Sequence, residues 1–338
     1  MSAPSSSKMS SLASSLALAA AGLLLLSACA GGDGGDAEDA GDDAFATVDT
    51  EFGEVVIEEE PERIVALGWG DAEIALQLGV EPVGAADWIG FGEENDGIGP
   101  WVENTYSESP EILGTMELSY EAVAELEPDL ILDVNSSGEE ERYERLSSIA
   151  TTVGVGPGGA NYLTERDEQL QMIGDALGKS EEAEQIIQDV EDTFAGVAEE
   201  HPEWQGLEAT VATRTSEGWG AYTESERVDF LEDLGFANNQ EILDLGEEGE
   251  WSVSLSGEQI DLFDADLIVA SPIWIDVEEI TEDEGWNNIP AVEDDRALVI
   301  EDELADAFAL GTPEAKEYAL EGLVPMIEEA LEGYAEQQ

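Results

Sequence analysis

Apolar and polar residues alternate with a period of two on either side of Glu51-Phe52-Gly53. This spacing predicts a β-hairpin over residues 46–57. From Arg63 the pattern changes to a short apolar strand (RIVAL), a Gly-Trp-Gly loop, a helix over residues 71–78 and a second strand over residues 82–86. Strand–helix–strand alternation with a Gly after the helix predicts a parallel sheet that is covered by helices.

The middle of the chain has helical spacing instead. Apolar residues recur every three or four positions over residues 163–198, Gly178 interrupts the pattern softly, and Pro202 should end it. Strand and helix patterns then resume. We predict an N-terminal lobe over residues 45–162, one long linking helix over residues 163–200 and a C-terminal lobe over residues 201–338.

Two segments on opposite sides of this helix align without a gap: SYEAVAELEPDLILDVNSS at residues 119–137 and SGEQIDLFDADLIVASPIW at residues 256–274. Each copy is typical of a short helix capped by a serine (Ser119, Ser256), followed by a buried strand. The match predicts an α/β fold with two lobes, each a central, mostly parallel sheet with flanking helices, joined by one long helix. The loops that follow the strands should then meet between the lobes, where open α/β sheets bind ligands.

The first 29 residues have the pattern of a bacterial lipoprotein signal. An apolar run ends in Leu-Ser-Ala-Cys at Cys29, the single cysteine of the chain, and Lys8 precedes the run. We predict a signal peptide over residues 1–28, lipidation of Cys29 and a flexible Gly/Asp linker over residues 29–44. A transmembrane anchor is the alternative, but the apolar segment is short and is interrupted by Ser and Gly. The mature protein should therefore be lipid-anchored and extracytoplasmic, on the outer face of the cytoplasmic membrane.

The charge of the chain is extreme. It has 82 acidic residues against 10 basic ones, a formal net charge of −72, and the acids are spread along the whole sequence. A hydrophobic content of 42% argues against a disordered acidic tail. This charge excludes nucleic acid as a partner, because the phosphate backbone would be repelled. It favours a halophilic protein, because salt screens the repulsion between the acidic groups. An acidic protein of an ordinary environment is the alternative.

No catalytic constellation is evident. The lone His201 precedes Pro202 at the end of an acidic helix, and no Gly-x-Ser-x-Gly motif is present. No cluster of His and Cys has the spacing of a transition-metal site. We therefore predict a binding protein that is a monomer, is not an enzyme and uses no metal or cofactor of its own. A secreted hydrolase or a surface adhesin on a similar scaffold is the alternative from another class.

Aromatic residues in predicted loops are the candidates for ligand contact. They lie at or just beyond the ends of predicted strands, next to Gly or polar residues, which is typical of a partly apolar binding surface. Arg214 ends a predicted strand and suits an anionic ligand group through bidentate hydrogen bonds, although a salt bridge to a neighbouring acid would also explain it. The predicted ligand-binding residues are Trp69, Trp88, Arg214, Trp219, Tyr222 and Trp274.

The lipoprotein signal, PERIVAL, LGVEPVGAA, the paired Ser-x-Glu-x7-Asp-Leu-Ile segments, IGDALG and WNNIPAVEDDRALVI together resemble the substrate-binding lipoproteins of iron–siderophore ABC importers. The resemblance covers residues 45–331. It implies capture of a ferric siderophore between two lobes and its delivery to an ABC transporter permease. It also implies that one acid on each lobe, Glu121 and Glu258, docks onto the permease. The same class includes cobalamin and haem binders, which remain the alternative for the ligand.

Overall fold

The structure is a computed structural model that describes residues 44–115, 117–247 and 250–334. The predicted signal peptide, Cys29 and the linker up to residue 43 lie outside the described residues. Within them, no helix is both long and apolar enough to cross a membrane.

The predicted hairpin is confirmed. β1 (Ala46–Thr50) pairs antiparallel with β2 (Gly53–Ile57). The sheet that follows is parallel throughout and has the order β5-β4-β3-β6-β7. Its strands are β3 (Ile64–Ala66), β4 (Gly84–Ala86), β5 (Glu111–Leu113), β6 (Leu130–Leu132) and β7 (Thr151–Val153).

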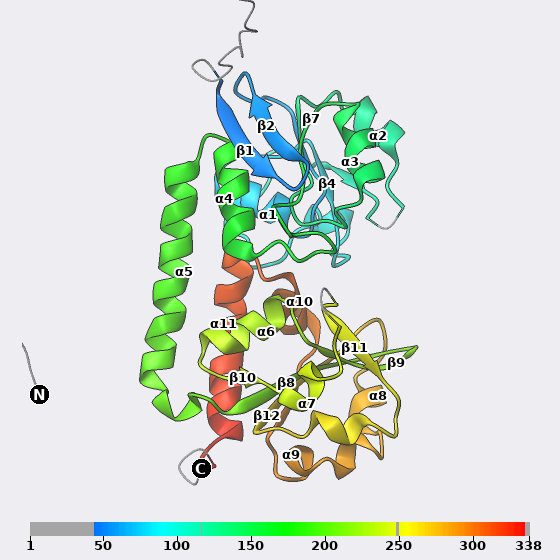
Figure 1. Cartoon of the computed structure of the whole chain (residues 1–338), viewed down its shortest axis with the longest axis vertical. Coiled ribbons are helices and arrows are strands. Elements are labelled where there is room, and N and C mark those ends of the chain that lie inside the picture. The colour runs from blue at the N-terminus through cyan, green and yellow to red at the C-terminus, as the bar shows by residue number, and fades with distance from the viewer. Residues whose placement is uncertain (1–43, 116, 248–249, 335–338) are drawn as a thin grey trace, which may run out of the picture. The chain divides into compact units, whose positions relative to one another are not determined.

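Helices cover both faces of this N-terminal sheet (Figure 1). Ile64 and Ala66 face a core that includes residues of α1 (Asp71–Gln77) and α4 (Arg166–Ala176). Val65, on the other face, packs with residues of α2 (Tyr120–Glu125) and α3 (Glu140–Ser147). A short strand buried on both faces is what a parallel sheet requires, and this explains the unbroken apolar run RIVAL.

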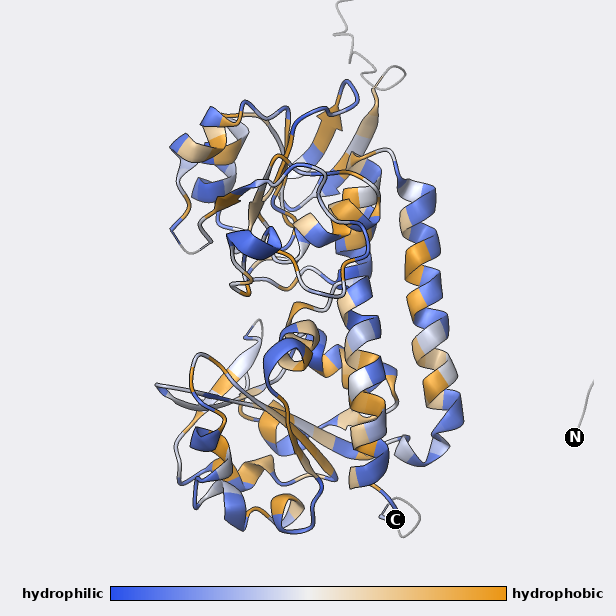
Figure 2. Ribbon diagram, turned by 180° about the vertical axis from the view of Figure 1, so that it is seen from behind, coloured by the Kyte–Doolittle hydropathy of each residue, from blue (hydrophilic) through white to orange (hydrophobic). Residues whose placement is uncertain are grey.

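The predicted linking helix is two helices. α4 ends at Ala176, and α5 (Ser180–Glu200) begins after a turn in which Gly178 has a φ of 66°. α5 contributes Ala183 to the N-terminal core and Phe194 to the C-terminal core, so it connects the lobes. Figure 2 shows that hydrophobic and hydrophilic residues alternate along α5, as expected of a helix packed on one side only.

The C-terminal sheet is mixed and has the order β11-β9-β8-β12-β13, with β10 beside the start of β8. β12 runs parallel to β8 and β13, whereas β9 and β11 are antiparallel to their neighbours. The strands are β8 (Glu208–Thr215), β9 (Gly218–Tyr222), β10 (Ala237–Asn238), β11 (Ser252–Leu255), β12 (Leu267–Pro272) and β13 (Ala297–Val299). The helices are α6 (Glu226–Asp233), α7 (Gln240–Leu243), α8 (Glu278–Thr281), α9 (Pro290–Glu293), α10 (Asp302–Leu310) and α11 (Pro313–Ala330).

This architecture confirms the predicted fold class, but the internal match holds for only part of its length. In the first copy, the Ser119 hydroxyl accepts the N–H of Ala122 and caps α2. In the second copy, Ser256 caps no α-helix: a turn and a short 3-10 helix (Ile260–Phe263) follow it. Gly257 occupies the first-turn position of that copy, and Gly disfavours helix. The buried strands β6 and β12 follow in both copies.

Candidate functional site

The Gly-Trp-Gly loop after β3 is held in one conformation by its two glycines. A Cβ on Gly68 would lie 2.3 Å from the carboxylate of Asp71, so any larger residue would collide with it. Gly70 has a φ of 84°, which favours glycine, and it precedes α1. The Trp69 N–H donates to the carbonyl of Asn135 at the end of β6. The loop is therefore fixed to the carboxyl edge of the N-terminal sheet.

Trp69 belongs to a group of half-buried rings at this edge. Its indole lies 5.7 Å from that of Trp88, which in turn meets Tyr162 edge-on at 5.4 Å. Trp88 follows β4 and donates its Nε1–H to the carbonyl of Leu67, which orients its ring. We call Trp69, Trp88 and Tyr162 the aromatic cluster. It brings together two of the residues predicted from the sequence and adds Tyr162, which carries no recognisable motif.

Two buried carboxylates, Asp71 and Glu73, lie in α1 directly after the Trp69 loop. Asp71 is fully buried and accepts N–H groups from Gly68, Val134 and the side chain of Gln169. Burial raises the pKa of Asp71 to about 6, against the lowering effect of these hydrogen bonds. Burial also raises the pKa of Glu73.

Three contacts join the lobes next to the cluster, and we call them the lobe junction. The Trp69 Nε1–H donates to the carbonyl of Leu310, at 3.2 Å. The hydroxyl of Thr312, just before α11, donates to Glu73 at 2.7 Å. The guanidinium of Arg166 forms a salt bridge with Glu226 of α6, at 3.2 Å. The aromatic cluster is therefore tied directly to the C-terminal lobe.

A buried ion pair lies at the same edge of the sheet. Asp133 follows β6, and its carboxylate binds Arg142 of α3 through two nitrogens, with Nη2 2.7 Å and Nε 2.9 Å from its oxygens. Ser136 donates a further hydrogen bond to Asp133. Burial raises the pKa of Asp133, while Arg142 opposes this. The backbone N–H of Tyr162 donates to the carbonyl of Ser136, so this pair lies next to the aromatic cluster.

In the C-terminal lobe, Arg214 and Trp274 lie at the ends of neighbouring strands. Arg214 pairs with Pro272 in the β8–β12 ladder, and its carbonyl accepts the N–H of Ile273. Trp274 is 92% exposed and has a φ of 55°, an unfavourable conformation for a bulky residue. The Arg214 guanidinium donates to the Thr215 carbonyl, and among the described residues its buried Nε has no hydrogen-bond partner.

The structure places the other two predicted ligand residues in the core. Trp219 is 4% exposed and stacks on Trp286, and Tyr222 is 3% exposed and stacks on Trp251. Both belong to strand β9 rather than to a loop, because the glycines around Trp219 are strand residues here. We correct the prediction and remove Trp219 and Tyr222 from the ligand-binding set.

The predicted docking acids are both exposed, in different settings. Glu121 occupies the first turn of α2, where a negative charge is favourable. Glu258 lies in the turn before the short 3-10 helix. Both side chains are exposed, so packing in a hydrophobic core does not account for an acid at either position.

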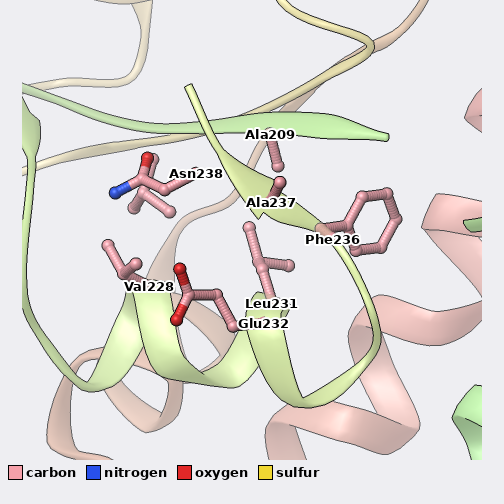
Figure 3. Close-up of a pocket in the computed structure, with 8 residues that line it drawn as sticks. Ala209, Val228, Leu231, Glu232, Phe236, Ala237 and Asn238 are labelled. Carbon is pink, nitrogen blue, oxygen red and sulfur yellow. The ribbon is translucent and has the colours of Figure 1, made fainter. Parts of the chain in front are cut away.

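Two concave regions elsewhere do not resemble the candidate site. The depression between α6, β8 and β10 has no room for a water molecule, and its lining is mostly apolar (Figure 3). A second cavity, of about 350 Å³, includes His201, whose ring stacks on Trp204 and contacts Glu203 and Glu328. Within the described ranges, no three His, Cys, Asp or Glu side chains are arranged to hold a metal ion.

Comparison with known proteins agrees with this architecture. Residues 64–304 match the family model described as periplasmic binding protein. A probable siderophore-binding lipoprotein of Bacillus subtilis is 26% identical over 258 residues, which are 72% of this chain and 75% of that protein. The Fe(3+) dicitrate-binding periplasmic protein of Escherichia coli is 28% identical over 181 residues, which are 53% of this chain and 57% of that protein.

Solved structures show the same fold. A periplasmic solute binding protein of Mycobacterium smegmatis superposes with a TM-score of 0.73 at 28% identity, over 85% of this chain and 98% of that one. The PiaA protein of Streptococcus pneumoniae in complex with ferrichrome superposes with a TM-score of 0.71 at 24% identity, over 84% and 98% of the two chains. These matches confirm the family resemblance predicted from the sequence.

Proposed function

Because this chain belongs to the periplasmic binding protein family, we propose that it captures a ferric siderophore outside the cytoplasmic membrane and delivers it to an ABC permease. The observation that carries the proposal is the aromatic cluster at the carboxyl edge of a parallel sheet, the edge where such sheets bind ligands. The names of the siderophore-binding and dicitrate-binding relatives support the same class of ligand.

Trp274 and Arg214 form the second half of the proposed site. An almost fully exposed indole in a strained backbone conformation is costly unless it contacts a ligand or a partner. The unpaired Nε of Arg214 can donate to an oxygen of the chelate. Glu121 and Glu258 are proposed to dock onto the permease, and Cys29 to carry the lipid that keeps the protein at the membrane.

The test is a fluorescence titration of the protein in high salt with ferric hydroxamate, ferric catecholate, ferric citrate and cobalamin. Tryptophan fluorescence should be quenched to saturation by at least one iron complex. Quenching by cobalamin alone would overturn the iron assignment. The same class of binding protein would then carry a different ligand.

A substitution locates the site. Trp88→Ala should weaken binding of that iron complex by about tenfold or more, as expected for an aromatic contact in a binding hot spot. The matched control is Trp251→Ala, which removes a 41% exposed indole from the C-terminal lobe outside the proposed site. Calorimetry on both variants measures the affinity independently of the lost fluorophore. Equal affinities in the two variants would exclude the aromatic cluster as the binding surface.

A further inference from the structure

The charge of the ligand can be inferred from where the basic side chains lie. Every basic residue of the chain except Lys8 belongs to the described part. Six of them contact acids, backbone carbonyls or aromatic rings: Arg63, Arg145, Lys179, Arg227, Arg296 and Lys316. Three remain beside the proposed site, namely Arg142, Arg166 and Arg214.

Two of these three form salt bridges with carboxylates. Arg142 is held by Asp133 through two nitrogens, and Arg166 by Glu226. Turning Arg142 toward a ligand would leave the Asp133 carboxylate, which is 3% exposed, buried without its cation. Stripping one partner from a buried ion pair is strongly unfavourable, so these guanidinium groups are not free for an anion.

The aromatic cluster also has an acid beside it. Asp87 directly precedes Trp88, and its carboxylate accepts the backbone N–H groups of Gly90, Phe91 and Gly92. These bonds orient the carboxylate without cancelling its charge. Near the proposed site, Arg214 and Arg227 have no acid bound to them in the described structure: Arg214 donates to the Thr215 carbonyl and contacts the Trp219 ring, and Arg227 lies over the Tyr222 ring. Two guanidinium groups without a bound acid are therefore the positive charges available to a ligand at this site, on a protein whose formal net charge is −72.

We propose that this protein selects neutral or cationic ferric complexes, the tris-hydroxamate class, and rejects polyanionic tris-catecholate complexes. Three singly charged hydroxamates cancel the charge of Fe(III), whereas three doubly charged catecholates leave three negative charges on the complex. Two guanidinium groups cannot balance the three negative charges of such a complex in this field, and like charges brought together at an interface oppose binding. The inference rests on the proposed function and specifies its ligand.

The test compares affinities for three probes on the wild-type protein: ferrichrome, which is neutral, ferrioxamine B, whose extra ammonium makes it cationic, and a ferric tris-catecholate. Titrations are run at low and at high NaCl, because ~1 M salt shortens the screening length to about 3 Å. We expect the tris-catecholate to bind at least about 100-fold more weakly than the better hydroxamate at low salt, with a smaller gap at high salt. Equal or tighter binding of the tris-catecholate would overturn this inference and leave the proposed function intact. If no iron complex binds and cobalamin does, the proposed function itself fails.

A pair of variants tests the role of the ion pair. Asp133→Asn removes the acid that neutralises Arg142 and should shift the ratio of the two affinities about tenfold toward the tris-catecholate. The control, Asp129→Asn, changes the net charge equally at the opposite end of β6, where Asp129 accepts backbone N–H groups of residues 62 and 63. It should leave the ratio unchanged. An equal shift in both variants would assign the effect to net charge and contradict the role of Arg142. If Asp133→Asn does not fold, the wild-type comparison decides alone.

Discussion

The position of Trp69 depends on individual neighbours rather than on the loop as a whole. Gly68 leaves room for the Asp71 carboxylate, and that carboxylate binds the N–H groups of Gly68 and Val134. The backbone carbonyl of Trp69 accepts hydrogen bonds from Arg166 and Gln169. The fully buried Asp71 therefore helps to position the Trp69 indole, which we propose contacts the ligand.

Asp71 should make the folded protein more stable as the pH falls, the opposite of what most carboxyl groups do. Its pKa is about 6 in the folded protein and 3.8 in the unfolded reference. Between these values the folded state binds more protons than the unfolded state, so lowering the pH stabilises the fold and raising it destabilises the fold. Between pH 7 and pH 4.5 this contribution is about 2 kcal/mol. Asp71→Asn should reduce the gain in unfolding free energy between these pH values by that amount, measured by urea denaturation. An identical pH dependence in both proteins would contradict the assignment.

At single residues, the sequence predicted which side chains lie at strand ends better than which side chains lie in the core. Trp69, Trp88, Arg214 and Trp274 lie at strand ends as predicted, because a strand that ends in Gly or polar residues leaves its next side chain outside the sheet. Trp219 misled the prediction because glycines on both sides imitate a loop, although its ring packs on Trp286. The Asp133–Arg142 pair and Tyr162 could not be predicted, since only the folded chain brings these segments together.

Among the elements, hydrophobic periodicity correctly predicted the hairpin, the βαβ order and the helical connection. Where the structure departs from these predictions, the chemistry of single residues explains the difference. The serine cap predicted α2 correctly, whereas Gly257 and the tertiary context turned the matching segment into a 3-10 helix. Gly178 was predicted as a soft interruption and is a full break, since it adopts a left-handed conformation between α4 and α5.

The turn between α4 and α5 should therefore be sensitive to a methyl group. Gly178→Ala would place a Cβ 2.6 Å from the ring of Phe45 and force a residue with a side chain into positive φ. We expect a loss of about 1–2 kcal/mol or more in the free energy of unfolding.

Gly196→Ala is the control for this prediction. Gly196 is a helical residue of α5, and a Cβ there would meet no atom within 4 Å. This substitution should stabilise the protein by up to about 1 kcal/mol, because Ala favours helix over Gly. Denaturant unfolding of both variants measures the difference. Equal effects would show that the turn is not constrained as described.

For the whole molecule, charge sets the conditions under which the fold is stable. A formal charge of −72 repels itself in the compact state, and salt screens that repulsion. The predicted saline habitat remains a prediction, but its physical consequence is measurable.

The midpoint of thermal unfolding should rise by roughly 5 °C or more between 0.1 M and 2 M NaCl, given that 1 kcal/mol corresponds to about 2–4 °C in domains of 150–250 residues. Calorimetry over a salt series provides the measurement. A neutral osmolyte at matched osmolarity is the control, because it leaves charge repulsion in place. A midpoint that is flat or falls with NaCl would contradict a destabilising role for the charge.

The hydrogen bond from the Trp69 indole to the Leu310 carbonyl has a consequence for how the loaded protein is told from the empty one. The Trp69 indole already contacts both lobes, so it does not have to be ordered when the ligand binds. Little conformational entropy is therefore lost on binding. The empty and loaded forms would then have nearly the same outline. A permease that distinguishes the two forms would then have to recognise the bound ligand itself rather than a change in the shape of the binding protein.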